Sequence, residues 1–375
     1  KIAPDALLTF TQFAPVPKSE FEGIDPLQVQ QAPFFQHPIG CGPFMVEEVN
    51  MKNYTILAPF DKYYNGVADF KIQLLPSAGD SDPNVVTRAK SGNLDYGYTK
   101  MVADVQALEG TPGITVTPID VRYTRLFYLN KFDKKDGSPA PLADVRVRQA
   151  LRYAIDMETI CETLFQGSAV PANALAPDAN LKGGDLNDYN YNPEKAKELL
   201  AEANWDPNTV IKAVYYYTDQ ATVDLMTAVQ AYLADVGIKM EFELVEGDLA
   251  TILWTAPADQ TNGPRAVDWD ICYAANAALS LHEYYDRYRT GSPTNSHTPE
   301  DAELNRLLDA TNASADVNAQ NEAFKELIKY ENENLFTMAL YYQPIFLITS
   351  DKIGDIQKGT PQFCINWDIQ NWNVQ

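Results

Sequence analysis

Histidine is scarce in this chain of 375 residues, which contains only three of them. His37, His282 and His297 lie far apart, and no HExxH pair occurs. A zinc hydrolase uses two such histidines, one helical turn apart, to hold its metal. The sequence therefore predicts no zinc site and gives no support to direct nickel ligation. We expect the three side chains to be surface or hydrogen-bonded residues.

Cysteine is equally rare, because the chain has only four, namely Cys41, Cys161, Cys272 and Cys364. They form no CxxC pair, which argues against zinc-ribbon and thioredoxin-like sites. We expect buried free thiols. A disulfide stays open as an alternative if the protein works in an oxidising compartment.

Basic residues are outnumbered, with 29 Lys and Arg against 51 Asp and Glu and a net charge of −22. Such a field repels phosphate backbones and anionic lipid surfaces, so nucleic-acid binding is not expected. Long apolar runs are also missing, and the longest, such as Met338–Tyr342, have the length of a strand. The chain starts at Lys1 without an initiator methionine, and we expect that an export signal was removed or not included.

Catalytic motifs are absent too. The sequence has no GxSxG, no GxxxxGK[ST] and no GxGxxG between a predicted strand and helix. Acidic pairs such as Asp268 and Asp270 arise by chance among 51 acids, and the turn around Asp80 and Asp82 lacks the ligand spacing of a calcium loop. We therefore predict a protein that is not an enzyme and carries no catalytic residue, metal or cofactor.

The elements that are present indicate an α/β protein. Short apolar runs punctuated by Gly and Pro predict strands over the first 120 residues, with a short helix near 85–91 ended by Gly92. From Asp144 the apolar period becomes helical, and Asp156 and Asn192 stand where N-caps of further helices belong.

A strand–helix–strand unit follows, over 211–217, 221–236 and 238–244. This order favours parallel strands joined by a right-handed crossover, so the second half is predicted to be α/β. Helices near 299–313 and 317–335 precede the last strands.

Aromatic residues are plentiful, with 21 Tyr, 16 Phe and 5 Trp. Tyrosines cluster at 63–64, 215–217, 284–285 and 341–342. A tyrosine has a large apolar face and a hydrogen-bonding tip, which suits a cleft for an amphipathic small ligand. For any single tyrosine, packing on one face of a sheet is the favoured explanation, so the aromatic content alone does not decide.

Six segments together resemble the extracellular solute-binding proteins, family 5, of peptide/nickel-type ABC importers, a family that includes oligopeptide- and dipeptide-binding proteins. Asp144–Asp156, which reads DVRVRQALRYAID, is similar to the strongest signature of that family. The other segments are Gly40–Phe44, Tyr63–Gly66, Ser91–Asp95, Tyr191–Leu200 and Ala339–Tyr342. The resemblance covers nearly the whole chain.

The resemblance implies a two-lobed periplasmic-binding-protein-like α/β fold of the class with an extended hinge, with mixed sheets flanked by helices. Lobe I would comprise 1–124 and 344–375, with its N-terminal strands absent, and lobe II would comprise 125–343. Family members bind their ligand between the lobes and close over it by hinge motion. On this basis the candidate ligand-binding residues are Tyr98, Tyr123, Arg125, Tyr128, Tyr273, Asn276 and Tyr342.

One position departs from the family pattern. After the predicted strand Trp269–Tyr273, a loop over 274–282 is expected, where peptide binders carry a Trp and then an Asp that pairs with the peptide's amino group. Here Asn276 and Leu279 stand at those positions. A buried ammonium without a carboxylate is costly, so either another acid, such as Glu283 or Asp286, substitutes or the ligand lacks that amine.

The expected function is therefore reversible binding of a small solute, most simply a peptide, and its delivery to the membrane permease of an ABC transporter. The protein is expected to be extracytoplasmic and monomeric. Two alternatives remain open at this point: a ligand-sensing or regulatory module of the same fold, and a receptor for an oligosaccharide, an opine or a metal chelate.

Overall fold

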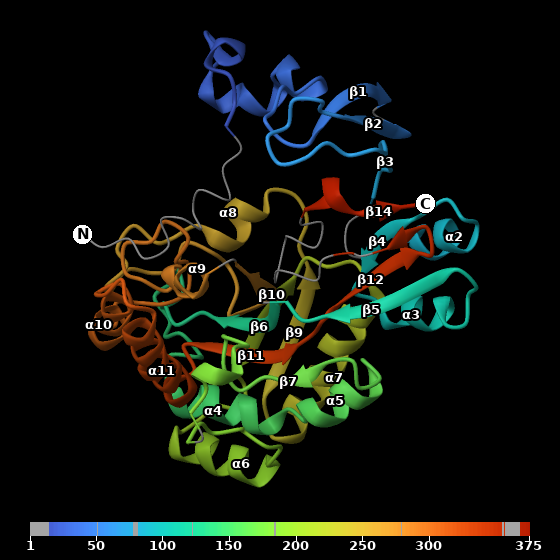
Figure 1. Cartoon of the computed structure of the whole chain (residues 1–375). Coiled ribbons are helices and arrows are strands. Elements are labelled where there is room, and N and C mark those ends of the chain that lie inside the picture. The colour runs from blue at the N-terminus through green and yellow to red at the C-terminus, as the bar shows by residue number, and fades with distance from the viewer. Residues whose placement is uncertain are drawn as a thin grey trace. The chain divides into compact units, whose positions relative to one another are not determined.

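A computed structural model describes residues 15–50, 52–77, 82–121, 123–183, 185–278, 280–354, 356 and 368–375. The chain divides into two compact units (Figure 1). The larger unit contains Asp120–Pro344, and the smaller unit contains the described residues of 15–119 and 345–375.

The larger unit is built on a six-stranded sheet with the order β7-β11-β6-β10-β8-β9. β6 pairs antiparallel with β10 on one side and with β11 on the other, whereas β10, β8 and β9 run parallel. The sheet is therefore mixed, and the predicted parallel strand–helix–strand unit is confirmed by β8, α7 and β9. The strand bounds are β6 Tyr123–Leu129, β7 Val170–Pro171, β8 Val210–Tyr215, β9 Lys239–Leu244, β10 Ile271–Ala277 and β11 Thr337–Tyr342.

All seven residues of β6 are buried. Successive side chains of a strand point to opposite faces, so Phe127 and Leu129 enter one hydrophobic core while Leu126 and Tyr128 enter another. A strand with both faces covered has no reason to alternate polar and apolar residues.

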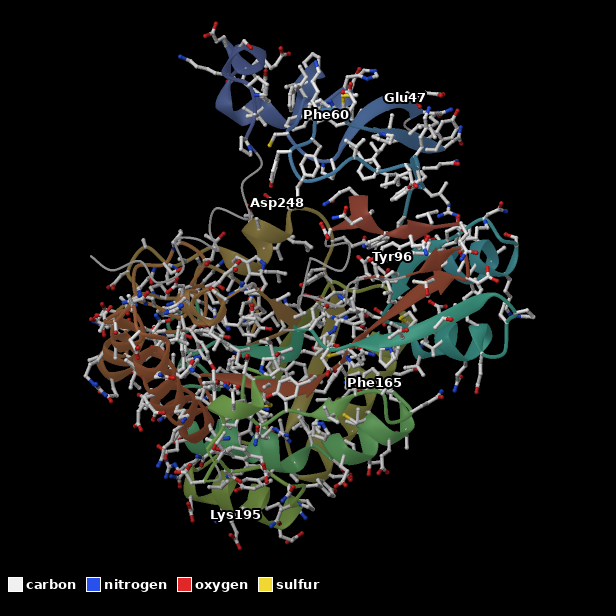
Figure 2. All side chains as sticks on the ribbon, in the orientation of Figure 1. Glu47, Phe60, Tyr96, Phe165, Lys195 and Asp248 are labelled. Carbon is white, nitrogen blue, oxygen red and sulfur yellow. The ribbon has the colours of Figure 1, made fainter. Side chains whose placement is uncertain are left out.

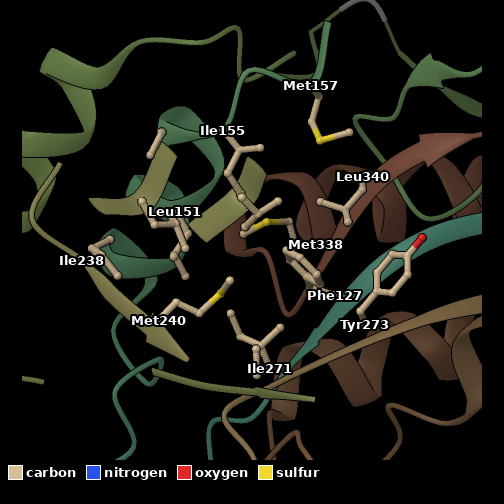
Figure 3. Packing of buried hydrophobic residues seen from close by; sticks show 14 of the residues in the cluster. Phe127, Leu151, Ile155, Met157, Ile238, Met240, Ile271, Tyr273, Met338 and Leu340 are labelled. Carbon is tan, nitrogen blue, oxygen red and sulfur yellow. The ribbon is translucent and has the colours of Figure 1, made fainter. Parts of the chain in front are cut away.

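The first face of this sheet is covered by helices α4, α5, α6 and α7, which lie on the same side in Figure 1. Their bounds are Val145–Ala154, Met157–Thr163, Pro193–Glu202 and Gln220–Asp235. Figure 3 shows how Leu151 and Ile155 from this side meet Phe127, Met240 and Met338 of the strands.

The N-caps predicted at Asp156 and Asn192 are confirmed, because their side chains accept hydrogen bonds from the backbone N–H groups of Thr159 and Lys195. Asp144 caps α4 in the same way by accepting from the N–H of Arg146. Each cap satisfies an N–H that the first helical turn leaves without a partner. In Figure 2 Lys195 lies on the outer side of α6, away from the core.

The second face is covered by α8, α9, α10 and α11, with the bounds Leu249–Trp254, Leu281–Asp286, Ala302–Thr311 and Val317–Asn334. Asp248, labelled in Figure 2, caps α8 by accepting from the N–H of Thr251. The helices predicted at 299–313 and 317–335 correspond to α10 and α11. Leu335, which follows α11, has a φ of 43°, in the left-handed region where a non-glycine residue is uncommon.

The loop predicted over 274–282 is wrong in its first part. β10 continues to Ala277, because Asn276 and Ala277 pair with Thr124 and Tyr123 at the start of β6. Ladder pairing over the whole length of β6 extends the strand, and this pairing is not visible in the local sequence of β10. Leu279 lies outside the described residues, and α9 begins at Leu281.

The smaller unit contains two three-stranded sheets, with the orders β1-β2-β3 and β4-β12-β5, and a two-stranded pair, β13-β14. Helix α2 is found where the sequence predicted it. Val85 and Ala89 of α2 and Leu108 of α3 pack with Ile348 of the second sheet. Strands β1 to β5 span Phe44–Asn50, Tyr54–Pro59, Ile72–Leu74, Tyr96–Thr99 and Ile114–Ile119. Strands β12 to β14 span Ile345–Ser350, Ile353–Gly354 and Asn373–Val374. The α-helices are Val85–Lys90 for α2 and Val102–Leu108 for α3.

Short 3-10 helices complete both units. They span Lys18–Phe21, Pro26–Gln31, Pro33–Gln36, Ala179–Leu181 and Ile369–Asn371. No helix within the described part of the chain is both long enough and apolar enough to cross a bilayer.

A buried carboxyl group joins three segments of the larger unit. Glu331 of α11 is 2% exposed, and its carboxyl oxygens accept hydrogen bonds from the backbone N–H of Leu175 and the hydroxyl of Tyr285, both at 2.7 Å. Burial raises the pKa of Glu331 to about 8, although both hydrogen bonds and nearby Lys182 lower it. The folded protein therefore keeps this carboxyl protonated at neutral pH.

We predict a specific pH dependence of stability from Glu331. Its pKa rises from 4.5 to about 8 on folding, so its contribution to the free energy of unfolding is full below about pH 4.5 and falls as pH rises toward 8. Glu331→Gln keeps an oxygen that accepts from the N–H of Leu175 and places an amide N–H that donates to the hydroxyl of Tyr285, without the ionisation, so it should remove this part of the decline. Denaturant unfolding at about pH 5 and about pH 9 measures the effect.

Glu333→Gln is the matched control, because Glu333 is exposed on the same helix. The explanation fails if Glu331→Gln and Glu333→Gln change the pH dependence equally.

Candidate ligand site

Four strands of the larger unit end at the edge of the sheet where β6 begins. β8, β9 and β10 are parallel to one another, and β10 and β11 are antiparallel to β6. The ends at Ala277 and Tyr342 therefore lie beside Tyr123 and Thr124. Open α/β sheets bind their ligands outside the carboxyl ends of their strands. A ligand site of this unit is therefore expected at its carboxyl edge.

Arg125 lies at this edge inside a cage of tyrosine rings. Its guanidinium carbon is 4.1 Å from the ring centre of Tyr217, 5.1 Å from Tyr123 and 5.7 Å from Tyr273. The residue is 7% exposed, and Nε and Nη1 are buried without a hydrogen-bond partner. Cation–π contacts stabilise the charge from the ring faces, but they leave the N–H groups unsatisfied.

Other buried arginines of the unit show how such a group is normally satisfied. Arg148 donates to the carbonyl oxygens of Leu142, Ala143 and Asn334 at 2.7–3.1 Å. Arg152 also donates to two backbone carbonyls. The third case, Arg265, pairs with Asp270 at 2.8 Å. Among the described residues, no carboxylate pairs with Arg125.

Arg125 nevertheless stays charged. Burial alone would lower its pKa, but the surrounding hydroxyls, led by Tyr273 and Tyr123, raise it well above the usual value. The edge therefore contains a permanent cation with free donors, shielded from water and surrounded by apolar ring faces.

Two tyrosines of the cage, Tyr273 and Tyr217, are held by hydrogen bonds to other tyrosines. The hydroxyls of Tyr273 and Tyr341 lie 2.8 Å apart, and those of Tyr216 and Tyr217 lie 3.0 Å apart. The rings of Tyr216 and Tyr217 also stack at 4.4 Å. Tyr217 is partly exposed, so it forms the solvent side of the cage.

The structure brings together three of the predicted residues, Tyr123, Arg125 and Tyr273. The sequence prediction missed Tyr217 and Tyr341 as site residues, although both lie in tyrosine clusters at the ends of predicted strands. Their location at strand ends could have identified them, because the carboxyl ends of strands that run in the same direction meet at one edge of a sheet.

Tyr128 lies on the opposite face from Tyr123 and Arg125, as the two-residue period of β6 requires. Its hydroxyl accepts a hydrogen bond of 2.6 Å from Arg287, whose guanidinium carbon lies 5.6 Å from the ring centre. Its ring is 4.9 Å from the ring of His297, which is buried. Burial and the nearby charges of Lys131 and Arg287 hold the pKa of His297 well below its usual value.

The remaining predicted residues lie elsewhere. Asn276 is buried and donates to the carbonyl of Tyr284. Tyr342 donates to the carbonyl of Ala174 and accepts from Nζ of Lys182 at 2.8 Å. In the smaller unit, Tyr98 lies on β4 and is 39% exposed.

The two acids considered as substitutes for the amine-pairing aspartate, Glu283 and Asp286, lie on α9, and both are exposed.

No cluster of three or more His, Cys, Asp or Glu side chains that could hold a metal occurs in the part of the chain that the structure describes. Cys161 and Cys272 are buried free thiols as predicted, whereas Cys41 is free but exposed. Cys364 lies outside the described residues. His282 is hydrogen-bonded, with Nε2 3.1 Å from the carbonyl oxygen of Thr311.

The unpaired charge of Arg125 predicts an unusual stability effect. Arg125→Met removes a buried cation whose donors have no acceptors, so it should raise the melting temperature of the ligand-free protein. A gain of 1 kcal/mol corresponds to about 2–4 °C in a domain of this size. Differential scanning calorimetry measures the change.

Arg148→Met is the matched control. It deprives three carbonyl oxygens of their donor, so it should lower the melting temperature, at about 1–3 kcal/mol for each acceptor left buried. A clear loss of stability in Arg125→Met would contradict the description of Arg125 as unsatisfied.

Comparison with known proteins agrees with this architecture. The model of the bacterial extracellular solute-binding proteins, family 5, middle part, matches residues 2–298. A peptide-binding ABC transporter protein of Brucella ovis is 28% identical over 244 residues, 64% of this chain and 44% of that protein. The oligopeptide-binding protein AppA of Bacillus subtilis is 26% identical over 272 residues, 67% of this chain and 46% of AppA. The chain thus spans about half the length of these curated relatives.

Solved structures show the same fold. The ABC transporter substrate-binding protein CtaP of Listeria monocytogenes superposes with a TM-score of 0.81 at 19% identity, over 99% of this chain and 74% of CtaP. AppA of Bacillus subtilis, in complex with a nonapeptide, gives a TM-score of 0.73 at 18% identity, over 96% of this chain and 72% of AppA. The predicted periplasmic-binding-protein-like α/β fold is therefore confirmed. The chain belongs to the bacterial extracellular solute-binding proteins of family 5.

Proposed function

We propose that this chain is the ligand-binding part of an extracytoplasmic receptor that delivers a peptide or peptide-like solute to the permease of an ABC importer. Membership of the solute-binding family supports the role of a receptor. The names of two relatives, a peptide-binding protein and an oligopeptide-binding protein, support a peptide as the solute. The protein works by binding and release, without chemical turnover.

One observation carries the proposal. The carboxyl edge of the larger sheet contains Arg125 with unsatisfied donors, surrounded by the rings of Tyr123, Tyr217 and Tyr273. Tyrosine rings and a fixed donor suit a peptide, which has both apolar side chains and polar backbone groups. A group that is unsatisfied in the free protein gains its partner when the ligand binds.

We assign direct ligand contacts to Tyr123, Arg125, Tyr217 and Tyr273. Tyr98, Tyr128, Asn276 and Tyr342 stay predictions, and the last three have hydrogen-bond partners within the larger unit. Release requires the site to open, so we propose hinge motion between a lobe of 1–124 with 344–375 and a lobe of 125–343.

Peptides are predicted to raise the melting temperature of the full-length protein that contains this sequence. A ligand that binds the folded state stabilises it by mass action. A thermal-shift screen with defined peptides, together with mass spectrometry of ligand released on denaturation, identifies the solute. Tyr217→Ala should weaken the binding of an identified peptide on the order of ten-fold, because one ring of the site is lost.

Tyr191→Ala is the control, since Tyr191 is exposed and its ring packs on Tyr232 near α6. The peptide proposal is abandoned if no peptide raises the melting temperature, and a defined turnover product would exclude a receptor.

A further inference from the structure

We propose that Arg125 binds a carboxylate of the solute, and that the protein thereby selects an acidic ligand. The proposal rests on the receptor function above, because it names the chemical group that the same site recognises. It adds a requirement that membership of the family does not impose: the solute must bring a negative charge to the carboxyl edge of the larger sheet.

Charge balance is the first argument. The chain carries 51 acidic and 29 basic residues, so a basic side chain has many acids to pair with. The buried Arg265 has such a partner in Asp270, and the exposed Arg306 pairs with Glu303. Buried Arg148 and Arg152 also lack an acid but donate to backbone carbonyls, whereas Nε and Nη1 of Arg125 have neither an acid nor a carbonyl among the described residues, and desolvating an unpaired ion is costly. A ligand carboxylate supplies the missing partner.

The geometry of the cage is the second argument. Three tyrosine rings lie within 4.1–5.7 Å of the guanidinium carbon, with Tyr217 closest. Contacts with ring centres supply no hydrogen-bond acceptor, so Nε and Nη1 remain without a partner. A carboxylate is itself flat and accepts two parallel hydrogen bonds from arginine, so it matches this arrangement.

Tyrosine hydroxyls around the cage are already hydrogen-bonded to one another and not to Arg125. The hydroxyls of Tyr273 and Tyr341 bind each other, and so do those of Tyr216 and Tyr217. A cation on the ligand would be repelled by Arg125, and a neutral amide would satisfy its donors but not its charge. Low exposure to water strengthens the ion pair once it forms.

Access to Arg125 runs past Tyr217. This residue follows β8 and is partly exposed, and its hydroxyl bonds only to the neighbouring Tyr216 among the described residues. The proposed ion pair therefore requires the Tyr217 side chain to move aside, so that Nε and Nη1 of Arg125 come within reach of the carboxylate oxygens.

The test compares an acid with its matched amide. Trialanine with a free carboxyl terminus and trialanine amide differ by one charge, and calorimetric titration measures both dissociation constants in the full-length protein. The acid should bind at least about ten-fold more tightly, and Arg125→Gln should remove the difference. Arg306→Gln makes the same charge change on the exposed surface and should preserve it.

Small anions test the site independently of peptides. Acetate and succinate should raise the melting temperature of the wild-type protein more than chloride at equal ionic strength, and this gain should be lost in Arg125→Gln. Arg125→Lys keeps the charge but not the planar donors, so it should retain part of the gain. It also serves as the test variant if Arg125→Gln does not fold.

The outcomes separate the two proposals. If trialanine and its amide bind equally and Arg125→Gln changes neither, the receptor function stands and the carboxylate proposal is overturned. If no peptide binds but succinate stabilises the protein through Arg125, the peptide function fails and the carboxylate site stands. If neither peptides nor carboxylates depend on Arg125, its role is structural and the proposal is wrong.

Discussion

Strand β6 forms hydrogen-bonded ladders on both of its sides, with β10 and with β11, and every residue of it is buried. Both cores of the larger unit contain side chains of this strand. The helices on each face of the sheet therefore pack on a core to which β6 contributes. The two ladders also set the register that brings the ends of β10 and β11 beside Tyr123. A shift of one residue would move Arg125 from its tyrosine cage to the opposite core.

Satisfaction of buried polar groups shapes the rest of the unit. Arg148 and Arg152 join loops to helices by donating to backbone carbonyls, and Glu331 joins α11 to Tyr285 and Leu175. These side chains are long and flexible, and each ordered contact must offset the entropy lost in fixing it. Arg125 differs because its order comes from ring contacts and from burial, while its donors remain available. Other buried groups of the unit also lack a partner, such as Nε of Arg287 and both ring nitrogens of His297, but these lie with Tyr128 on the other face of the sheet. Unsatisfied donors at the carboxyl edge are what a binding site requires.

The net charge of −22 and the local charge at Arg125 act over different distances. The long-range field repels an acidic solute and slows its approach, and salt weakens that repulsion. Contact with Arg125 takes place in a dehydrated cage, where screening is weak and hydrogen bonds are strong. Affinity for an acid and a highly acidic surface are therefore compatible, and the surface charge acts chiefly on the rate of association.

Local sequence was sufficient for much of the fold. The helical spacing of apolar residues and the residues suited to cap helices located α4, α7, α10 and α11. The order strand, helix, strand predicted the parallel pairing of β8 and β9. These features depend on neighbours within a few residues. The end of β10 was misjudged because it depends on pairing with β6, which is about 150 residues away in the sequence, as Ala277 and Tyr123 show.

The candidate site divides in the same way. Composition and the missing motifs argued against a metal or catalytic site, and resemblance to the family pointed to Tyr123, Arg125 and Tyr273. Only the tertiary structure decided that Tyr217 covers Arg125, that Tyr128 faces the other core, and that no described acid pairs with the guanidinium. The reason is physical: a side chain's type is set by the sequence, but its partners, its burial and the satisfaction of its donors arise when distant strands converge at one edge of a sheet.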